Sequence, residues 1–508
     1  MLIIAVVLGY FALLFAVSRW TGRRATNESF YRADRRSPWY MVAFGMVGAS
    51  ISGVTFVSVP GMVMRTQMTY LQTCLGFILG YVVVAFVLLP LYYRLNLTSI
   101  YAYLGQRLGE HSHRTASSFF LLSKMTGSAV KFYVVCIILQ RFAFGPMGVP
   151  FAATVVGLVL LIWLYTRQGG IKTLVWTDSL QTFCLFAALL LIIYKVVTDL
   201  DMTVGEAAAA VAHSDLSRIF VWDDWLSKQY FWKQFLSGVF IVIVMTGLDQ
   251  DMMQKNLTCK TLRGAQKDMC SYGVAFVPVN LLFLSLGVLL TVWYQQQGGA
   301  LPAGDELLPQ YVQDNVQRSM FNDQWSMFNV QCSMFNVQWS MFNVQCSMFN
   351  VQWLEILFIL GIIAASFSSA DSALTSLTTI YCVDIARNSG DERLRKRVHL
   401  VMCALFVLFI LLFETVNSTS LIDAIYVIVG YTYGPLLGLF AFGLLTRRQV
   451  RDRWVPSIAV ASPLLCYLLD WWVGSQTGYH FGYELLMLNG LLTFAGLYTL
   501  SVARPSRA

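Results

Sequence analysis

Long apolar runs separated by short polar connections dominate the hydrophobic pattern of this chain. A helix needs about 20 mostly apolar residues to cross the hydrocarbon core of a bilayer. About thirteen runs approach that length, so the pattern predicts an all-α polytopic membrane protein with about 13 transmembrane helices. The predicted ranges, with approximate ends, are 2–18, 40–62, 69–93, 116–140, 150–166, 174–197, 230–250, 271–294, 354–384, 398–415, 421–446, 455–473 and 483–502.

The composition favours the same class of protein. Hydrophobic residues make up 57% of the 508 residues, and only 12% are Asp, Glu, Lys or Arg. That charged share is roughly half of what soluble proteins carry. The mean hydropathy is +0.61, as expected for an integral membrane protein.

A formal net charge of +8 raises the question of nucleic acid, but the distribution of the charges argues against such a partner. Lys and Arg crowd alternate connections, whereas the connection at 198–229 carries five aspartates. This is the positive-inside pattern of membrane proteins. It predicts a plasma (inner) membrane protein with its N-terminus outside and its C-terminus in the cytoplasm.

One stretch does not follow the helical pattern. Residues 319–353 consist of a seven-residue unit, SMFNVQW or a close variant, repeated five times. The unit has apolar residues on every face and lacks charged flanking positions, so it does not indicate an ordinary coiled coil. Its alternation suits a strand equally well. We expect one membrane domain over 1–508, with its core at about 40–446, and a functionless tandem insertion at 319–353 in an external loop. The alternative for the insertion is a sticky, aggregation-prone segment.

The run Ala364–Thr379, AASFSSADSALTSLTT, places many oxygens at the depth of the hydrocarbon. A single hydroxyl in a membrane helix bonds back to the preceding turn. That explanation does not cover a cluster that includes a carboxylate, Asp371, because intramembrane carboxylates are costly and mark ion or solute paths. Hydroxyl and carbonyl oxygens suit Na⁺, so this run predicts a cation site.

The segment Gly48–Gly61, GASISGVTFVSVPG, interrupts another apolar run with glycines, a proline and hydroxyls. It predicts a broken helix whose free carbonyls bind a cation and whose half-helix ends bind a solute. The alternative is a flexible kink with small-residue packing. Asp178 lies near the cytoplasmic end of the predicted range 174–197, where it is a site residue, an interfacial cap or a salt-bridge partner. We interpret Thr246–Lys267 as a structural cytoplasmic turn.

Four motifs carry a family resemblance: GGIKTLVWTDSLQ, DQDMMQKNLTCKTLRGAQK, AASFSSADSALTS and ASISGVTFVSVPG. With these motifs the chain resembles the sodium:solute symporter family. The resemblance implies a five-plus-five inverted-repeat fold of the LeuT type. The second to sixth and seventh to eleventh ranges would form the two halves, with the other three helices peripheral.

The resemblance also implies ion sites. A common sodium site would use backbone carbonyls of Gly48, Ile51 and Ala365 with the hydroxyls of Ser368 and Ser369. A possible second sodium site would use Asp178, Ser368, Asp371 and Ser372. Asp371 departs from the family pattern, because relatives have a neutral hydroxyl residue there. An alternative is that Asp371 neutralises Lys124 or Lys131, so that only one Na⁺ moves.

Candidate solute-binding residues come partly from the resemblance and partly from charge. By resemblance to sialic-acid transporters these are Ser50, Ser52 and Thr55; by charge or polarity they are Gln72, Lys124 and Lys131. Sialic-acid relatives use an arginine where this chain has Gly127. An intramembrane lysine either holds a solute carboxylate or pairs with a structural acid.

These observations predict Na⁺-coupled symport of a small polar or anionic organic solute, such as a sugar, sialic-acid-like acid, carboxylate or vitamin. A non-transporting sensor on the same fold is the alternative, which the short tail after the last run disfavours. We expect no enzymatic activity, no metal other than Na⁺, no organic cofactor, and a monomeric transport unit in the lipid bilayer.

Overall fold

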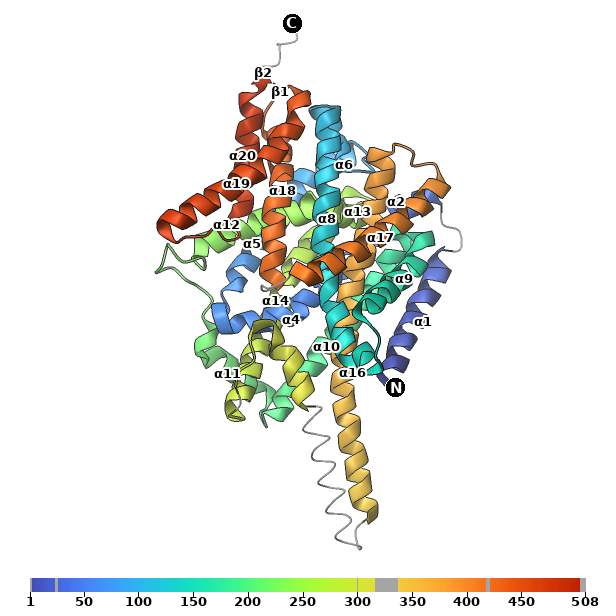
Figure 1. Ribbon diagram of the computed structural model, residues 1–508, viewed down its shortest axis with the longest axis vertical. Coiled ribbons are helices and arrows are strands. Elements are labelled where there is room, and N and C mark those ends of the chain that lie inside the picture. The colour runs from blue at the N-terminus through green and yellow to red at the C-terminus, as the bar shows by residue number, and fades with distance from the viewer. Residues whose placement is uncertain (1, 23–25, 299, 316–336, 417–420, 503–508) are drawn as a thin grey trace.

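The computed structural model of the protein describes residues 2–22, 26–298, 300–315, 337–416 and 421–502, and helices dominate them (Figure 1). The helices are α1 (Leu2–Gly22), α2 (Asn27–Arg32), α3 (Trp39–Ser50), α4 (Gly53–Thr66), α5 (Tyr70–Val83), α6 (Leu89–Arg94), α7 (Ala102–Arg107), α8 (Glu110–Leu139), α9 (Phe151–Gly169), α10 (Ile171–Asp199), α11 (Val204–His213), α12 (Phe231–Val242), α13 (Gln250–Asn256), α14 (Leu262–Gln296), α16 (Val337–Ile380), α17 (Glu392–Val416), α18 (Leu421–Leu445), α19 (Val455–Thr477) and α20 (Leu485–Thr499). Short π-helical turns at 84–88, 140–144, 243–247 and 381–385 continue α5, α8, α12 and α16. Two-residue strands, β1 (Gln449–Val450) and β2 (Ser501–Val502), pair antiparallel.

The helices confirm the all-α membrane fold. Eight described helices are long and apolar enough to cross a membrane, and ten if each of two bent pairs counts as one span. Three shorter apolar helices coincide with further predicted ranges, and every one of the thirteen ranges overlaps a helix. The number of helices that cross the bilayer stays a prediction.

The two bent pairs are placed as an inverted repeat requires. The axes of α3 and α4 differ by 59°, and the segment Phe231–Gly247 meets α13 at 69°. Each bent pair begins one of the two predicted sets of five helices. Half-helix ends and free backbone are tolerated at such depth only where they face protein or a cavity.

Helix α16 forms the centre of the bundle and packs against α3, α4, α8 and α10. It is the most enclosed of the spanning helices, and α19 is the least enclosed. Figure 1 shows α1 and α19 at the edges of the bundle, in agreement with their predicted peripheral position.

Glycines let the helices of the two halves approach closely. A Cβ atom at Gly76 on α5 would overlap the carbonyl of Phe235 on α12. A Cβ atom at Gly238 on α12 would overlap the carbonyl of Thr73 on α5. Backbones in such reciprocal contact are typical of small-residue helix packing in membranes.

The two ends of the bundle differ in charge. We name the end with the connections at 94–109, 257–261, 386–391 and 446–454 the basic side, and the end with 200–229 the acidic side. The basic side is tied together around Asp384, which accepts hydrogen bonds from Ser99 at 2.5 Å and Ser117 at 2.8 Å. His113 Nε2 lies 3.1 Å from the same carboxylate, which is fully buried.

Part of the tandem repeat is helical. Residues 337–353 extend α16 beyond the other helices at the end opposite the basic side (Figure 1), and 319–336 lie outside the described residues. Neither the expected external location of the repeat nor its expected lack of function is tested by this arrangement.

We expect that replacing residues 319–353 by a short Gly/Ser linker leaves the fold intact, because the predicted range 354–384 begins after the repeat and no predicted site residue is removed. Thermal unfolding and size-exclusion chromatography in detergent should match those of the full chain. A loss of monodisperse protein would contradict the prediction.

Candidate functional site

The break between α3 and α4 exposes backbone oxygens. Ile51 (φ −80°, ψ 93°) and Ser52 (φ −83°, ψ 171°) adopt extended conformations between the two helices. Among the described residues, the N–H of Ser52 does not donate to Gly48 O, and the N–H of Thr55 does not donate to Ile51 O. The carbonyls of Gly48 and Ile51 therefore lack their helical donors, as the sequence predicted for a broken helix.

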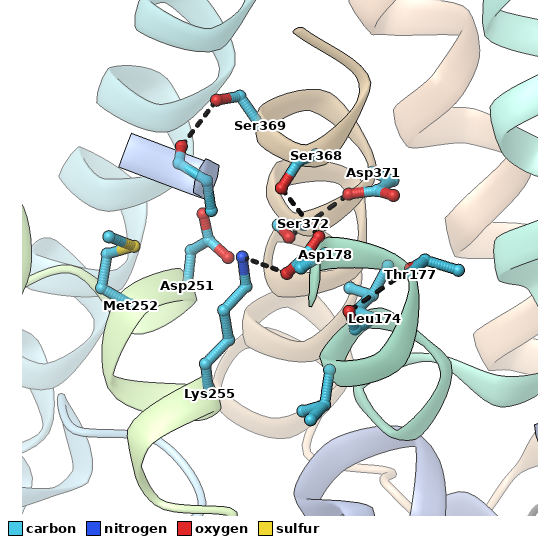
Figure 2. A network of polar contacts seen from close by, with 12 residues as sticks. Leu174, Thr177, Asp178, Asp251, Met252, Lys255, Ser368, Ser369, Asp371 and Ser372 are labelled. Carbon is cyan, nitrogen blue, oxygen red and sulfur yellow. Dashed lines mark hydrogen bonds and ion pairs between the residues drawn. The ribbon is translucent and has the colours of Figure 1, made fainter. Parts of the chain in front are cut away.

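Hydroxyls of α16 face this break. Ser369 Oγ donates to Ala49 O at 2.8 Å, and Ser368 Oγ donates to Asp178 Oδ1 of α10 at 2.8 Å (Figure 2). Ala365 lies one turn before Ser369 on α16 and is buried. The structure thus brings the segments that carry the predicted common sodium site together.

The residues of the predicted second sodium site also meet, but each already has a partner within the protein. Asp178 Oδ2 lies 2.8 Å from the ammonium nitrogen of Lys255. Asp371 accepts a hydrogen bond from Tyr165 Oη at 2.7 Å and faces the Ser372 hydroxyl at 3.3 Å. Figure 2 shows Lys255 extending from α13 toward Asp178, with Ser368 and Ser372 above Asp178 in this view.

The second broken helix contributes carboxylates that the sequence analysis missed. Asp249 caps α13 by accepting the backbone N–H of Asp251 at 2.8 Å. Lys124 of α8 lies 3.0 Å from Asp249 Oδ2 and 2.8 Å from Asp251 Oδ2. Tyr433 Oη also donates to Asp249 at 2.8 Å.

Two sequence interpretations are therefore wrong. The segment Thr246–Lys267 does not simply leave the bundle as a cytoplasmic turn, because its first half bends inward and buries charged side chains. Asp371 does not neutralise Lys124, which pairs with the carboxylates of α13 instead. It does not neutralise Lys131 either, since no ion pair joins those two residues in the described chain. The signal for a buried site was a cluster of charges directly after Gly247, at the end of an apolar run.

A cavity lies beside both breaks. Of the predicted solute-binding residues, those that line it are Ser50, Ser52, Thr55, Lys124 and Lys131. Gln72 is not among the lining residues. Its amide instead joins the acidic side, by donating to Gln229 O at 2.9 Å and accepting from Val221 N–H at 3.2 Å.

The two lysines that line the cavity differ in their ion-pair partners. Lys124 holds two carboxylates, whereas Lys131, two turns further along α8, forms no ion pair or hydrogen bond within the described residues. Tyr70 lines both this cavity and a second pocket next to Lys228 and Gln229 on the acidic side. The cavity thus borders the acidic side, and the contacts around Asp384 lie at the opposite end of the bundle.

A cavity with charged and hydroxyl side chains at the meeting point of two broken membrane helices is typical of secondary transporters, which bind their solute and coupling ions at such breaks. The model of the sodium:solute symporter family matches residues 30–452, and this chain belongs to that family. Its relatives are Na⁺/solute symporters.

Individual comparisons agree with this assignment. The chain is 22% identical over 478 residues to the sodium/sialic acid symporter SiaT of Proteus mirabilis (strain HI4320), covering 90% of this chain and 87% of that protein. It is 25% identical over 442 residues to the sodium-dependent multivitamin transporter of Oryctolagus cuniculus, covering 85% of this chain but 63% of that longer protein.

A solved structure of a Na⁺-coupled sialic acid symporter, in a substrate-bound outward-open state, superposes with a TM-score of 0.75. The identity is 21%, and the alignment covers 98% of this chain and 97% of the other. At that identity the likeness establishes the LeuT-like fold and leaves the solute open.

The close packing of α3 on α10 generates a prediction. A Cβ atom at Gly48 would overlap the Thr182 side chain and lie 3.0 Å from its Cα, so that the backbones must separate. We expect Gly48→Ala to destabilise the protein by about 1–3 kcal/mol, the usual cost of overpacking. Thermal unfolding in detergent measures this effect.

The matched control is Gly127→Ala on α8, because a Cβ atom added there would have no other atom within 4 Å. Equal melting temperatures for Gly48→Ala and Gly127→Ala would contradict the predicted close packing.

Proposed function

We propose that this protein carries a small organic anion across the plasma (inner) membrane together with Na⁺, by alternating access and without chemical change to the solute. The observation that carries this proposal is Lys131, a cationic side chain without an ion-pair partner among the described residues, in the cavity beside the two helix breaks. An uncompensated ammonium at membrane depth is costly, so an anionic ligand stabilises it.

Sodium is proposed to bind between the α3–α4 break and α16. Its ligands are the carbonyls of Gly48, Ile51 and Ala365 and the hydroxyls of Ser368 and Ser369. Two observations support this assignment: the carbonyls of Gly48 and Ile51 lack helical donors, and both hydroxyls point to groups on neighbouring helices. Because Ser368 donates its proton to Asp178, its oxygen lone pairs remain free for a cation.

The solute is proposed to bind next to the ion. Lys131 holds an acidic group of the solute, and the hydroxyls of Ser50, Ser52 and Thr55 contact its polar remainder. Lys124 is not assigned to the solute, because two carboxylates already surround it. A carboxylate is the simplest such anionic group, which fits carboxylic acids, acidic sugars and acidic vitamins.

Coupling follows from the position of the ion. A Na⁺ bound between α3 and α16 would join the broken helix to the centre of the bundle and so stabilise the conformation open to the outside.

We assign the acidic side to the outside, with the N-terminus there, and the basic side to the cytoplasm, by the positive-inside rule. The membrane potential contributes about 2.3 kcal/mol per elementary charge per 100 mV. Inward movement of Na⁺ down its gradient then drives uptake of the solute, and we propose that a single chain suffices.

Lys131→Met should weaken solute binding roughly 10- to 150-fold, because a hydrogen bond to a charged group contributes about 1.5–3 kcal/mol. The measurement is a thermal-shift screen of organic anions in Na⁺, followed by uptake of the best anion into proteoliposomes. Lys131→Arg retains the charge and should retain most of the affinity.

A matched control is Lys195→Met, which removes a lysine that pairs with Asp199 on the same helix, outside the cavity. The proposal is contradicted if Lys131→Met binds the anion as tightly as the wild type, or if only neutral solutes bind.

Ser368→Ala and Ser369→Ala should each raise the Na⁺ concentration for half-maximal uptake. Removal of one neutral ligand costs on the order of 1–3 kcal/mol, or about 5- to 150-fold in that concentration. Ser376→Ala is the control on the same helix, because its hydroxyl donates only to Ala373 O within α16. Wild-type sodium dependence in both test variants would exclude the site.

A further inference from the structure

The predicted second sodium site already contains a positive charge of the protein itself, the ammonium group of Lys255. Lys255 and Asp178 form a fully buried ion pair, with side chains only 2% and 1% exposed and a separation of 2.8 Å. Asp251 lies one helical turn before Lys255 on α13. Figure 2 shows the carboxylates of Asp178 and Asp251 on two sides of the Lys255 ammonium.

The oxygens that a second Na⁺ needs are already engaged. Asp178 uses Oδ1 to accept from Ser368 and Oδ2 to face Lys255. Asp371 accepts from Tyr165. Sodium at this place would lie beside an ammonium group in a low-dielectric interior, where like charges repel strongly. The four predicted ligands therefore do not fit a second Na⁺ while Lys255 stays in position.

We propose that the Lys255 ammonium is the resident cation of this second site, and that one Na⁺ accompanies each solute. Lys255 is then a positioning residue. It holds the Asp178 carboxylate in place, and Asp178 in turn orients the Ser368 hydroxyl whose oxygen faces the common sodium site. The inference rests on the proposed function, since it concerns the number of coupling ions in that cycle.

The test is equilibrium binding of radioactive ²²Na⁺ to purified protein, because a count of bound ions does not depend on which solute is carried. Wild type should bind about one Na⁺ per chain with a Hill coefficient of about 1. Lys255→Ala removes the internal cation but keeps Asp178, Ser368, Asp371 and Ser372. It should bind about two Na⁺, with a Hill coefficient approaching 2.

Two variants control for the loss of a buried side chain. Lys255→Arg keeps a cation and should bind one Na⁺. The double variant Asp178→Asn/Lys255→Met removes both partners of the ion pair, and it should also bind one Na⁺, because the carboxylate that would attract a second ion is gone.

The outcomes separate the inference from the proposed function. Two Na⁺ in wild type, or one Na⁺ in a folded Lys255→Ala, would overturn the role of Lys255 and leave Na⁺ coupling standing. No saturable Na⁺ binding in wild type would overturn the proposed function itself. If Lys255→Ala unfolds in low salt, its melting temperature should rise more steeply with Na⁺ than that of the wild type, and a parallel rise would overturn the inference.

Discussion

A carboxylate buried among membrane helices has to be matched by positive charge or hydrogen-bond donors, and this constraint governs the centre of the protein. Breaking a buried ion pair by removing one partner leaves a charge whose desolvation nothing offsets. Lys255 of α13 pairs with Asp178 of α10, and Lys124 of α8 pairs with both Asp249 and Asp251 at the start of α13. These pairs tie α10 to α13 and α8 to α13, so that charge neutrality also fixes how the central helices are arranged.

The backbone breaks and the glycines make this arrangement possible. The bend before α13 turns Asp249, Asp251 and Lys255 toward the bundle interior, instead of letting them leave with the basic connection. The small residue Gly48 allows α3 to approach α10 until its last carbonyls lie beside α16. The same features thus provide the structural contacts and the backbone oxygens of the proposed sodium site.

Much of this architecture was predictable from the sequence because it depends on local patterns. Apolar run lengths located the helices, and the glycines around Ser50 located the break. The partners of charged residues were not predictable. The segment from Asp249 to Lys255 ends an apolar run and precedes a basic connection, so it resembles a solvated turn until the 69° bend is known. Spacing along α8 likewise cannot tell which carboxylate Lys124 meets. Gln72 lies in an apolar run, but its amide binds the backbone of the distant segment 221–229.

The contacts around Asp384 join three separate segments of the basic side. One carboxylate holds Ser99 before α7 and both His113 and Ser117 on α8, and it belongs to the turn that follows α16. These partners share a single acceptor group, so a movement of that turn releases all of them together. The segment before α7, helix α8 and the turn after α16 are therefore coupled at the basic side, because none of them can move away without changing the contacts of the others.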